Sequence, residues 1–159
     1  MAQDRDRILE RQRAAASRLA CLIGGVSEAA LRRAPGPGKW SVVEVIAHLA
    51  EDELSSTWRY RQMLEHPGVE LTAFDQNLWA QWGDYARWEI GEALALYRLL
   101  REANIRFLSR LTTGEWTHWG THRERGRMTI GELAAHMCDH DERHFTQIER
   151  GIVRYNVAG

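Results

Sequence analysis

Apolar residues recur every three to four positions along most of this 159-residue chain, with charged residues at the positions between them. This spacing is typical of amphipathic helices, which bury one stripe and expose their other faces. Alternation with a period of two does not extend over a convincing length, so a sheet is not expected. The pattern predicts four long helices, at about residues 4–22, 41–66, 89–111 and 129–151.

Two of these helices begin with the residues of a capping box. Ser41 is followed by Glu44, and Thr129 is followed by Glu132. In a capping box the hydroxyl accepts a hydrogen bond from the amide three residues on, and the carboxylate reaches back to the first amide. In both helices a histidine follows seven residues after the cap, which indicates that the two helices are built alike.

The connections contain all three prolines, at positions where a helix must stop. Short helices are expected at about residues 27–33 and 75–82, the second of them within a long crossover between the second and third long helices. Residues 112–128 form another long connection. Four long amphipathic helices in a chain of this length imply an all-α four-helix bundle that forms a single domain over residues 1–159.

Composition and charge narrow the class of protein. Lys and Arg number 21 against 22 Asp and Glu, so the net charge of −1 gives no overall field that would attract nucleic acid. No apolar run approaches the roughly 18 residues that a membrane span needs. Cys21 and Cys138 form no CxxC pair and are expected to be reduced thiols. We therefore expect a cytoplasmic protein without nucleic-acid or membrane partners.

The most unusual feature is a row of three histidines in the last helix, His136, His140 and His144. Each step of four residues advances about 40° around a helix, so the three rings share a stripe about 80° wide. Leu133 and Ile148 lie on or beside this stripe, which indicates that the imidazoles point into the bundle. Two imidazoles four residues apart can bind one ion. All three cannot, because the first and last are about 12 Å apart along the axis.

A third ligand would come from another helix, and His48 is the candidate because it follows a defined helix start on an apolar face. Spacing leaves two pairs open in the last helix, His136 with His140 and His140 with His144. His140 is common to both pairs. The remaining histidine of the row would line a pocket or contact a ligand.

Other metal sites fit the sequence less well. The chain has no HExxH motif, and two cysteines are too few for a cysteine-rich structural zinc site. Only residues 141–144 approximate the ExxH motif that a di-iron bundle needs twice. The remaining histidines are expected at the surface: His66, His118 and His122.

Three segments of the chain are similar to motifs of a known family. "KWSVVEVIAHLAEDE" resembles the second-helix motif of the DinB/YfiT-like superfamily, and "HMCDHDERHFTQIE" resembles its fourth-helix motif, in which HxxxH is followed by Gln or His. "TAFDQNLWAQ" looks like the crossover of the YfiT branch. The resemblance covers residues 36–150.

This resemblance implies a ligand set as well as a fold. The metal ligands of the family fall on His48, His140 and His144, with Gln147 in the position after the HxxxH pair, while His136 corresponds to no ligand of the YfiT branch. The resemblance also implies an up-down-down-up four-helix bundle with long crossover connections. It further implies one divalent metal ion, usually zinc or nickel, and a homodimer.

Activities described for the superfamily include thiol-dependent S-transfer, which gives the first hypothesis. The ion would bind a low-molecular-weight thiol as thiolate, which then attacks a small-molecule electrophile. Glu51 and Asp52 lie within helical reach of His48 and could orient a ligand or move a proton. Arg59, further along the same face, could contact a carboxylate of the thiol or substrate. Two alternatives remain: hydrolysis by metal-bound hydroxide, and a non-catalytic, stress-associated bundle that binds metal or a partner.

Overall fold

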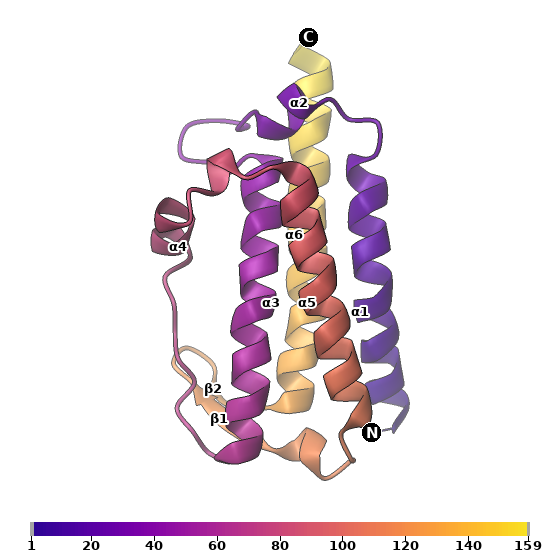
Figure 1. Cartoon of the computed structure of the whole chain (residues 1–159), viewed down its shortest axis with the longest axis vertical. Helices are drawn as coiled ribbons and strands as arrows, with labels where there is room; N and C mark the ends of the chain where they lie inside the picture. Colours follow the sequence, from indigo (N-terminus) through magenta and orange to yellow (C-terminus); the bar gives the residue numbers. More distant parts are fainter. Residues whose placement is uncertain (1, 159) are drawn as a thin grey trace.

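Four long helices run the length of the molecule. The computed structural model describes residues 2–158, and the side chains of residues 3–153. Figure 1 shows that the first and last of these helices run in one direction and the two middle ones in the other, which confirms the all-α, up-down-down-up bundle. The four helices are α1 (Ala2–Ile23), α3 (Val42–Glu65), α5 (Ile90–Arg110) and α6 (Ile130–Ala158).

Shorter elements occupy the connections, including both predicted short helices. A two-stranded antiparallel hairpin precedes α6, so the prediction that the chain contains no sheet is wrong for this connection. The short elements are α2 (Glu28–Arg32), α4 (Gln76–Trp82), the 3₁₀ turns η1 (Tyr85–Arg87) and η2 (Glu115–Thr117), and the strands β1 (Trp119–His122) and β2 (Gly126–Thr129).

The hairpin is held in place by the segment that follows α3. Leu71 donates a backbone hydrogen bond to Thr121 at 2.9 Å, and Thr121 donates one to Val69 at 2.8 Å. The strands have only four residues each, too few for an alternating pattern to stand out in the sequence. Their pairing with a segment about fifty residues earlier supplies the stability that the local sequence lacks.

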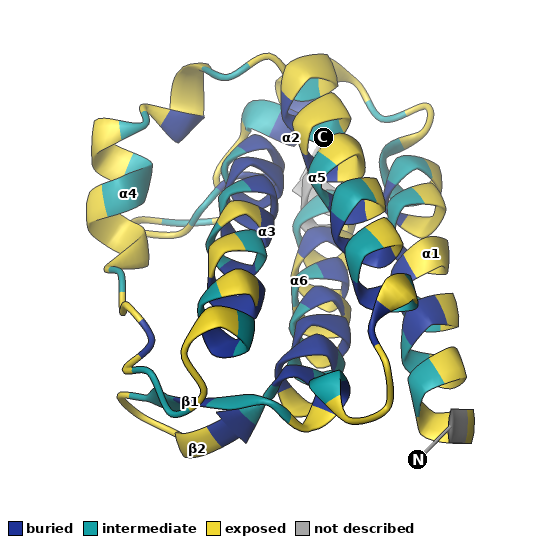
Figure 2. Ribbon diagram, turned by 60° about the horizontal axis from the view of Figure 1, so that its bottom comes forward, coloured by how far each residue is buried: buried dark blue, intermediate teal, exposed yellow. Residues whose placement is uncertain are grey.

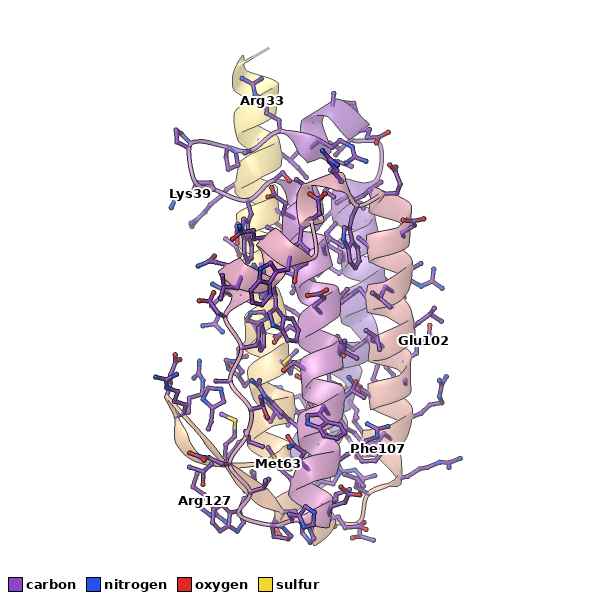
Figure 3. All side chains as sticks on the ribbon, turned by 60° about the vertical axis from the view of Figure 1, so that its left-hand side comes forward. Arg33, Lys39, Met63, Glu102, Phe107 and Arg127 are labelled. Carbon is purple, nitrogen blue, oxygen red and sulfur yellow. The ribbon has the colours of Figure 1, made fainter. Side chains whose placement is uncertain are left out.

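The crossover from α3 to α5 returns along the outside of the bundle. Figure 1 shows α4 beside α3, away from the other helices. Asp75 caps α4, because its Oδ1 accepts from the backbone amides of Asn77 at 2.8 Å and Leu78 at 3.2 Å. Figure 3 shows Arg127 of the hairpin and Met63 of α3 at the same end of the bundle, with Lys39 at the opposite end.

The apolar core divides into two clusters along the bundle axis. Ile46 and Phe145 belong to one cluster, and Met63 and Leu133 to the other. Figure 2 shows the buried side of α3 as an almost continuous dark stripe. No helix in the described part of the chain is long and apolar enough to cross a membrane. Both cysteines are free thiols, as predicted.

A buried ionic network lies between the two clusters. Arg101 of α5 is 1% exposed, and its guanidinium contacts Glu53 of α3 and Asp141 of α6, each at 2.8 Å. The hydroxyl of Tyr97 donates to Asp141 at 3.2 Å, and the amide of Asn104 donates to Glu53 at 2.9 Å. Each charge therefore has partners, and the network fixes the rotation of α6 against α3 and α5.

Both predicted capping boxes are present. The hydroxyl of Ser41 accepts from the amide of Glu44 at 3.3 Å, and the carboxylate of Glu44 accepts from the amide of Ser41 at 2.7 Å. At the start of α6 the hydroxyl of Thr129 accepts from the amide of Glu132 at 3.1 Å, and the carboxylate accepts in return at 2.7 Å. The two histidine-bearing helices are thus started by the same local structure.

We expect Ser41→Ala to lower the free energy of unfolding by about 1 kcal/mol, because the amide of Glu44 loses its partner and the Glu44 carboxylate loses the hydroxyl of Ser41. Urea unfolding followed by circular dichroism measures this loss. Ser17→Ala is the matched control, since Ser17 is exposed within α1 and alanine favours a helix there. Equal stability of the two variants would contradict the role of the cap.

Candidate metal centre

Three histidine side chains converge at the middle of the bundle, His48 from α3 and His140 and His144 from α6. The Nε2 atom of His140 lies 3.4 Å from that of His48 and 3.1 Å from that of His144. The ligand atoms of all three lie within 4.8 Å of one another. The three residues that the resemblance pairs as ligands are therefore close enough to hold one ion.

Contacts on the other side of the rings orient these nitrogens. His144 Nδ1 lies 2.9 Å from Oε1 of Gln147, an acceptor, so its hydrogen is on Nδ1 and a lone pair is on Nε2. His140 Nδ1 lies 3.3 Å from Oδ2 of Asp52, although the angle is poor for a hydrogen bond. With the hydrogen of His140 also on Nδ1, toward Asp52, the two Nε2 atoms 3.1 Å apart would present lone pairs to each other. A cation between them would relieve this repulsion, so the residues fit a metal ion.

The imidazoles are held in their neutral form. Burial, and then the neighbouring His144, lowers the pKa of His48 to about 3. Burial, and then the two other rings, lowers the pKa of His140 to about 2. The pKa of His144 is also lowered, chiefly by burial. Neutral imidazole is the form that binds a metal ion, so these rings need not lose a proton at neutral pH.

The two carboxylates expected to assist the site lie in different surroundings. Asp52 is buried, faces His140 and lines the adjacent cavity. Burial, and then the charge of Glu53, raises the pKa of Asp52 to about 7. Glu51 instead accepts a hydrogen bond from the hydroxyl of Tyr85 and does not line that cavity. Asp52 is therefore the carboxylate that the fold brings to the histidines.

An open cavity of about 540 Å³ adjoins the histidines, between α3, α6, the crossover and the hairpin. Arg59 reaches it from α3 and is 7% exposed, with Nη2 donating to the carbonyl of Thr72 at 2.8 Å. The cavity is lined by His48, Asp52, Arg59, Ala73, Phe74, Asp75, Gln76, His122, Arg123, Glu124, Arg125, His136 and His140.

The other histidines fall into separate places. The ring of His136 lies 6.1 Å from that of His140 and lines the cavity without joining the three-nitrogen cluster. His66 is exposed at the end of α3, as predicted. His118 is half-buried. His122 is half-buried as well, and the hairpin places it in the wall of the open cavity.

Sequence reasoning missed the buried network and the hairpin arginines. Asp141 carried a usable signal, since it lies four residues after Met137 and four before Phe145, on the buried face of α6. A carboxylate in an apolar stripe needs a cationic partner, here Arg101. For Arg125 there was no comparable signal, because only the hairpin places it at the cavity.

We expect Asp52→Asn to weaken zinc binding by about tenfold, since the residue that faces a ligand imidazole tunes its orientation and basicity. Competition with a chromogenic chelator measures the affinity. Glu51→Gln is the control, because its side chain contacts Tyr85 rather than a ligand histidine, and it is expected to leave zinc affinity unchanged. An equal loss of zinc affinity in both variants would show that removing a negative charge near the site, rather than the contact with His140, weakens binding.

Comparisons with known proteins agree with this fold. A sequence model of the DinB superfamily matches residues 8–148. "Putative metal-dependent hydrolase OB0413" of Oceanobacillus iheyensis is 21% identical over 133 residues, which are 84% of this chain and 76% of that protein. The solved structure of YfiT from Bacillus subtilis, described as "a probable metal-dependent hydrolase with an unusual four-helix bundle topology", matches with a TM-score of 0.88 and 19% identity, over 96% of this chain and 87% of that one. The chain therefore belongs to the DinB superfamily.

Proposed function

We propose that this protein is a metal-dependent hydrolase whose divalent ion is bound by His48, His140 and His144. The observation that carries the proposal is the convergence of three Nε2 atoms beside an open cavity. The names of the Oceanobacillus and Bacillus relatives support the reaction class. Zinc and nickel are the proposed ions, because both accept imidazole ligands.

Such an ion, bound by three neutral ligands, would supply an uncompensated double positive charge that acidifies a water molecule and polarises a carbonyl. The chain supplies the remaining groups. Asp52 lies 3.3 Å from Nδ1 of His140 and lines the cavity, and it is the proposed acceptor of the proton that leaves the water. Arg59 lines the same cavity and is the proposed contact for the substrate.

Thiol-dependent S-transfer is a second candidate, favoured by the charge of the ligand set. Three neutral imidazoles leave the positive charge free to stabilise a thiolate, which a site with carboxylate ligands would do less well. The sulfur of a low-molecular-weight thiol would bond to an electrophilic carbon and displace its leaving group, while Asp52 accepts the thiol proton. A cavity of about 540 Å³ has room for both reactants.

One experiment separates the candidates. Zinc-loaded and nickel-loaded protein is offered either a panel of activated esters and amides alone, or a thiol together with an alkyl halide. Hydrolysis without thiol supports the first candidate, and consumption of thiol with the electrophile supports the second. His140→Ala is the control and is expected to be folded and inactive in both assays. A fully loaded protein that consumes neither set would favour the non-catalytic bundle.

A homodimer remains part of the proposal. Leu54 and Trp58, one turn apart on α3, are 51% and 58% exposed, which is unusual for large apolar side chains. Light scattering at micromolar concentration measures the mass. A mass of one chain would overturn the proposed dimer without affecting the proposed site.

A further inference from the structure

We propose that the substrate carries a carboxylate, which binds in the cavity between Arg59 of α3 and Arg125 of the hairpin turn. The inference rests on the proposed function and names the class of its substrate. The hydrolysed or transferred bond would lie at the histidines, and the carboxylate would lie at the cationic end of the same cavity. The argument depends on where the cavity gathers its charges.

Two arginines, which carry the positive charge, and two neutral histidines line this part of the cavity and come from three elements. Arg59 belongs to α3, His122 and Arg125 to the hairpin, and His136 to α6. The charges of Arg59 and Arg125 both lower the pKa of His122, after the larger effect of its burial. Arg125 and His122 likewise contribute to the lowered pKa of His136. The fold therefore assembles one positive region from distant parts of the sequence.

The donors in this region are available to a ligand. The side chains of Arg123 and Arg125 form no ion pair or hydrogen bond with any residue whose side chain is described. Nε of Arg59 is buried without a hydrogen-bond partner, while its Nη2 is anchored on Thr72. His122 Nδ1 accepts from the amide of Glu124 at 3.2 Å, so its hydrogen is on Nε2 and can be donated.

The acidic groups of the wall are largely committed elsewhere. Asp75 caps α4 with its Oδ1, and Asp52 faces His140. Glu124 is exposed at the hairpin turn. These acids do not neutralise the arginines, so the region stays positive, but they would repel an anion with more than one negative charge. Guanidinium groups match both carboxylate and phosphate, and the nearby acids favour the singly charged carboxylate over a phosphate dianion.

The test is calorimetric binding of succinate to zinc-loaded protein and to protein freed of zinc by a chelator. Succinamide is the neutral probe of the same size. We expect succinate but not succinamide to bind in both forms, and Arg125→Gln to weaken succinate binding by about tenfold, since it removes charge-assisted hydrogen bonds. Arg59→Gln is expected to act in the same direction, with circular dichroism as the check on its fold.

Arg127→Gln is the matched control. Arg127 lies on the same hairpin and is labelled in Figure 3. Its Cζ atom lies 5.0 Å from the centroid of the Trp119 ring, and its side chain does not line the cavity. Equal weakening by Arg125→Gln and Arg127→Gln would overturn the proposal, as would tighter binding of inorganic phosphate than of succinate. Calorimetry measures binding without turnover, so the carboxylate site and the proposed reaction can fail separately. If succinate binding depends on Arg125 but the protein hydrolyses no ester, the carboxylate site stands and the proposed reaction is rejected.

Discussion

His140→Ala is expected to reduce bound zinc or nickel from about one ion per chain to none, because a mononuclear site cannot close without its central imidazole. The Nε2 atom of His140 lies 3.4 Å from that of His48 and 3.1 Å from that of His144, and the three ligand atoms form a triangle within 4.8 Å. His48→Ala and His144→Ala are expected to have the same effect. Elemental analysis of protein purified without a histidine tag measures the metal content.

His136→Ala is the control for this prediction, since its ring lies 6.1 Å from that of His140 and outside the three-nitrogen cluster. Metal retained in His136→Ala and lost in the other three variants supports the ligand set. Metal lost in His136→Ala and kept in His144→Ala would show that His136, and not His144, is the third ligand. Wild-type protein that stays empty after zinc and nickel are offered would reject the metal site altogether.

Arg101→Met is expected to lower the free energy of unfolding by about 3 to 5 kcal/mol, the usual effect of breaking a buried ion pair. The guanidinium is 1% exposed and contacts both Glu53 and Asp141, so its removal leaves two carboxylates buried without a cation. Urea unfolding measures the change. Arg98→Met, one turn earlier on the exposed side of α5, is the control and is expected to change stability by less than about 0.5 kcal/mol.

A second variant separates lost charge from lost packing. In Arg101→Met combined with Glu53→Leu and Asp141→Leu, no buried charge remains from the Arg101 ion pairs, and much of the stability should return. A combined variant less stable than Arg101→Met alone would show that the network contributes through shape rather than through charge. Loss of stability in Arg101→Met no greater than in Arg98→Met would contradict the structural role.

Much of the fold could be predicted because its signals are local. Each long helix carries an apolar stripe over most of its buried face, and the residues of both capping boxes mark helix starts to within a residue. The sequence pattern predicts an end of α6 at about residue 151, whereas the helix continues to Ala158. The hairpin escaped prediction because its stability comes from Val69 and Leu71, which a local pattern cannot connect to Thr121.

The candidate site was predictable only in part. Helical spacing singled out His140 but could not choose between His136 and His144, since both lie four residues away; the family resemblance made that choice. In the structure Gln147 turns His144 toward the other two rings. His122 and Arg125 escaped notice because only the folded hairpin carries them to the cavity.

The distance along the chain between the histidines bears on how the protein folds. His48 and His140 are 92 residues apart, so the site cannot exist until α3 and α6 have docked. A metal ion would then add its binding energy to the native state after the slowest contacts have formed, and would leave the early collapse to the helices themselves. A bound ion would therefore stabilise the native state but not the transition state for folding. Removing it with a chelator would speed unfolding and leave the folding rate unchanged.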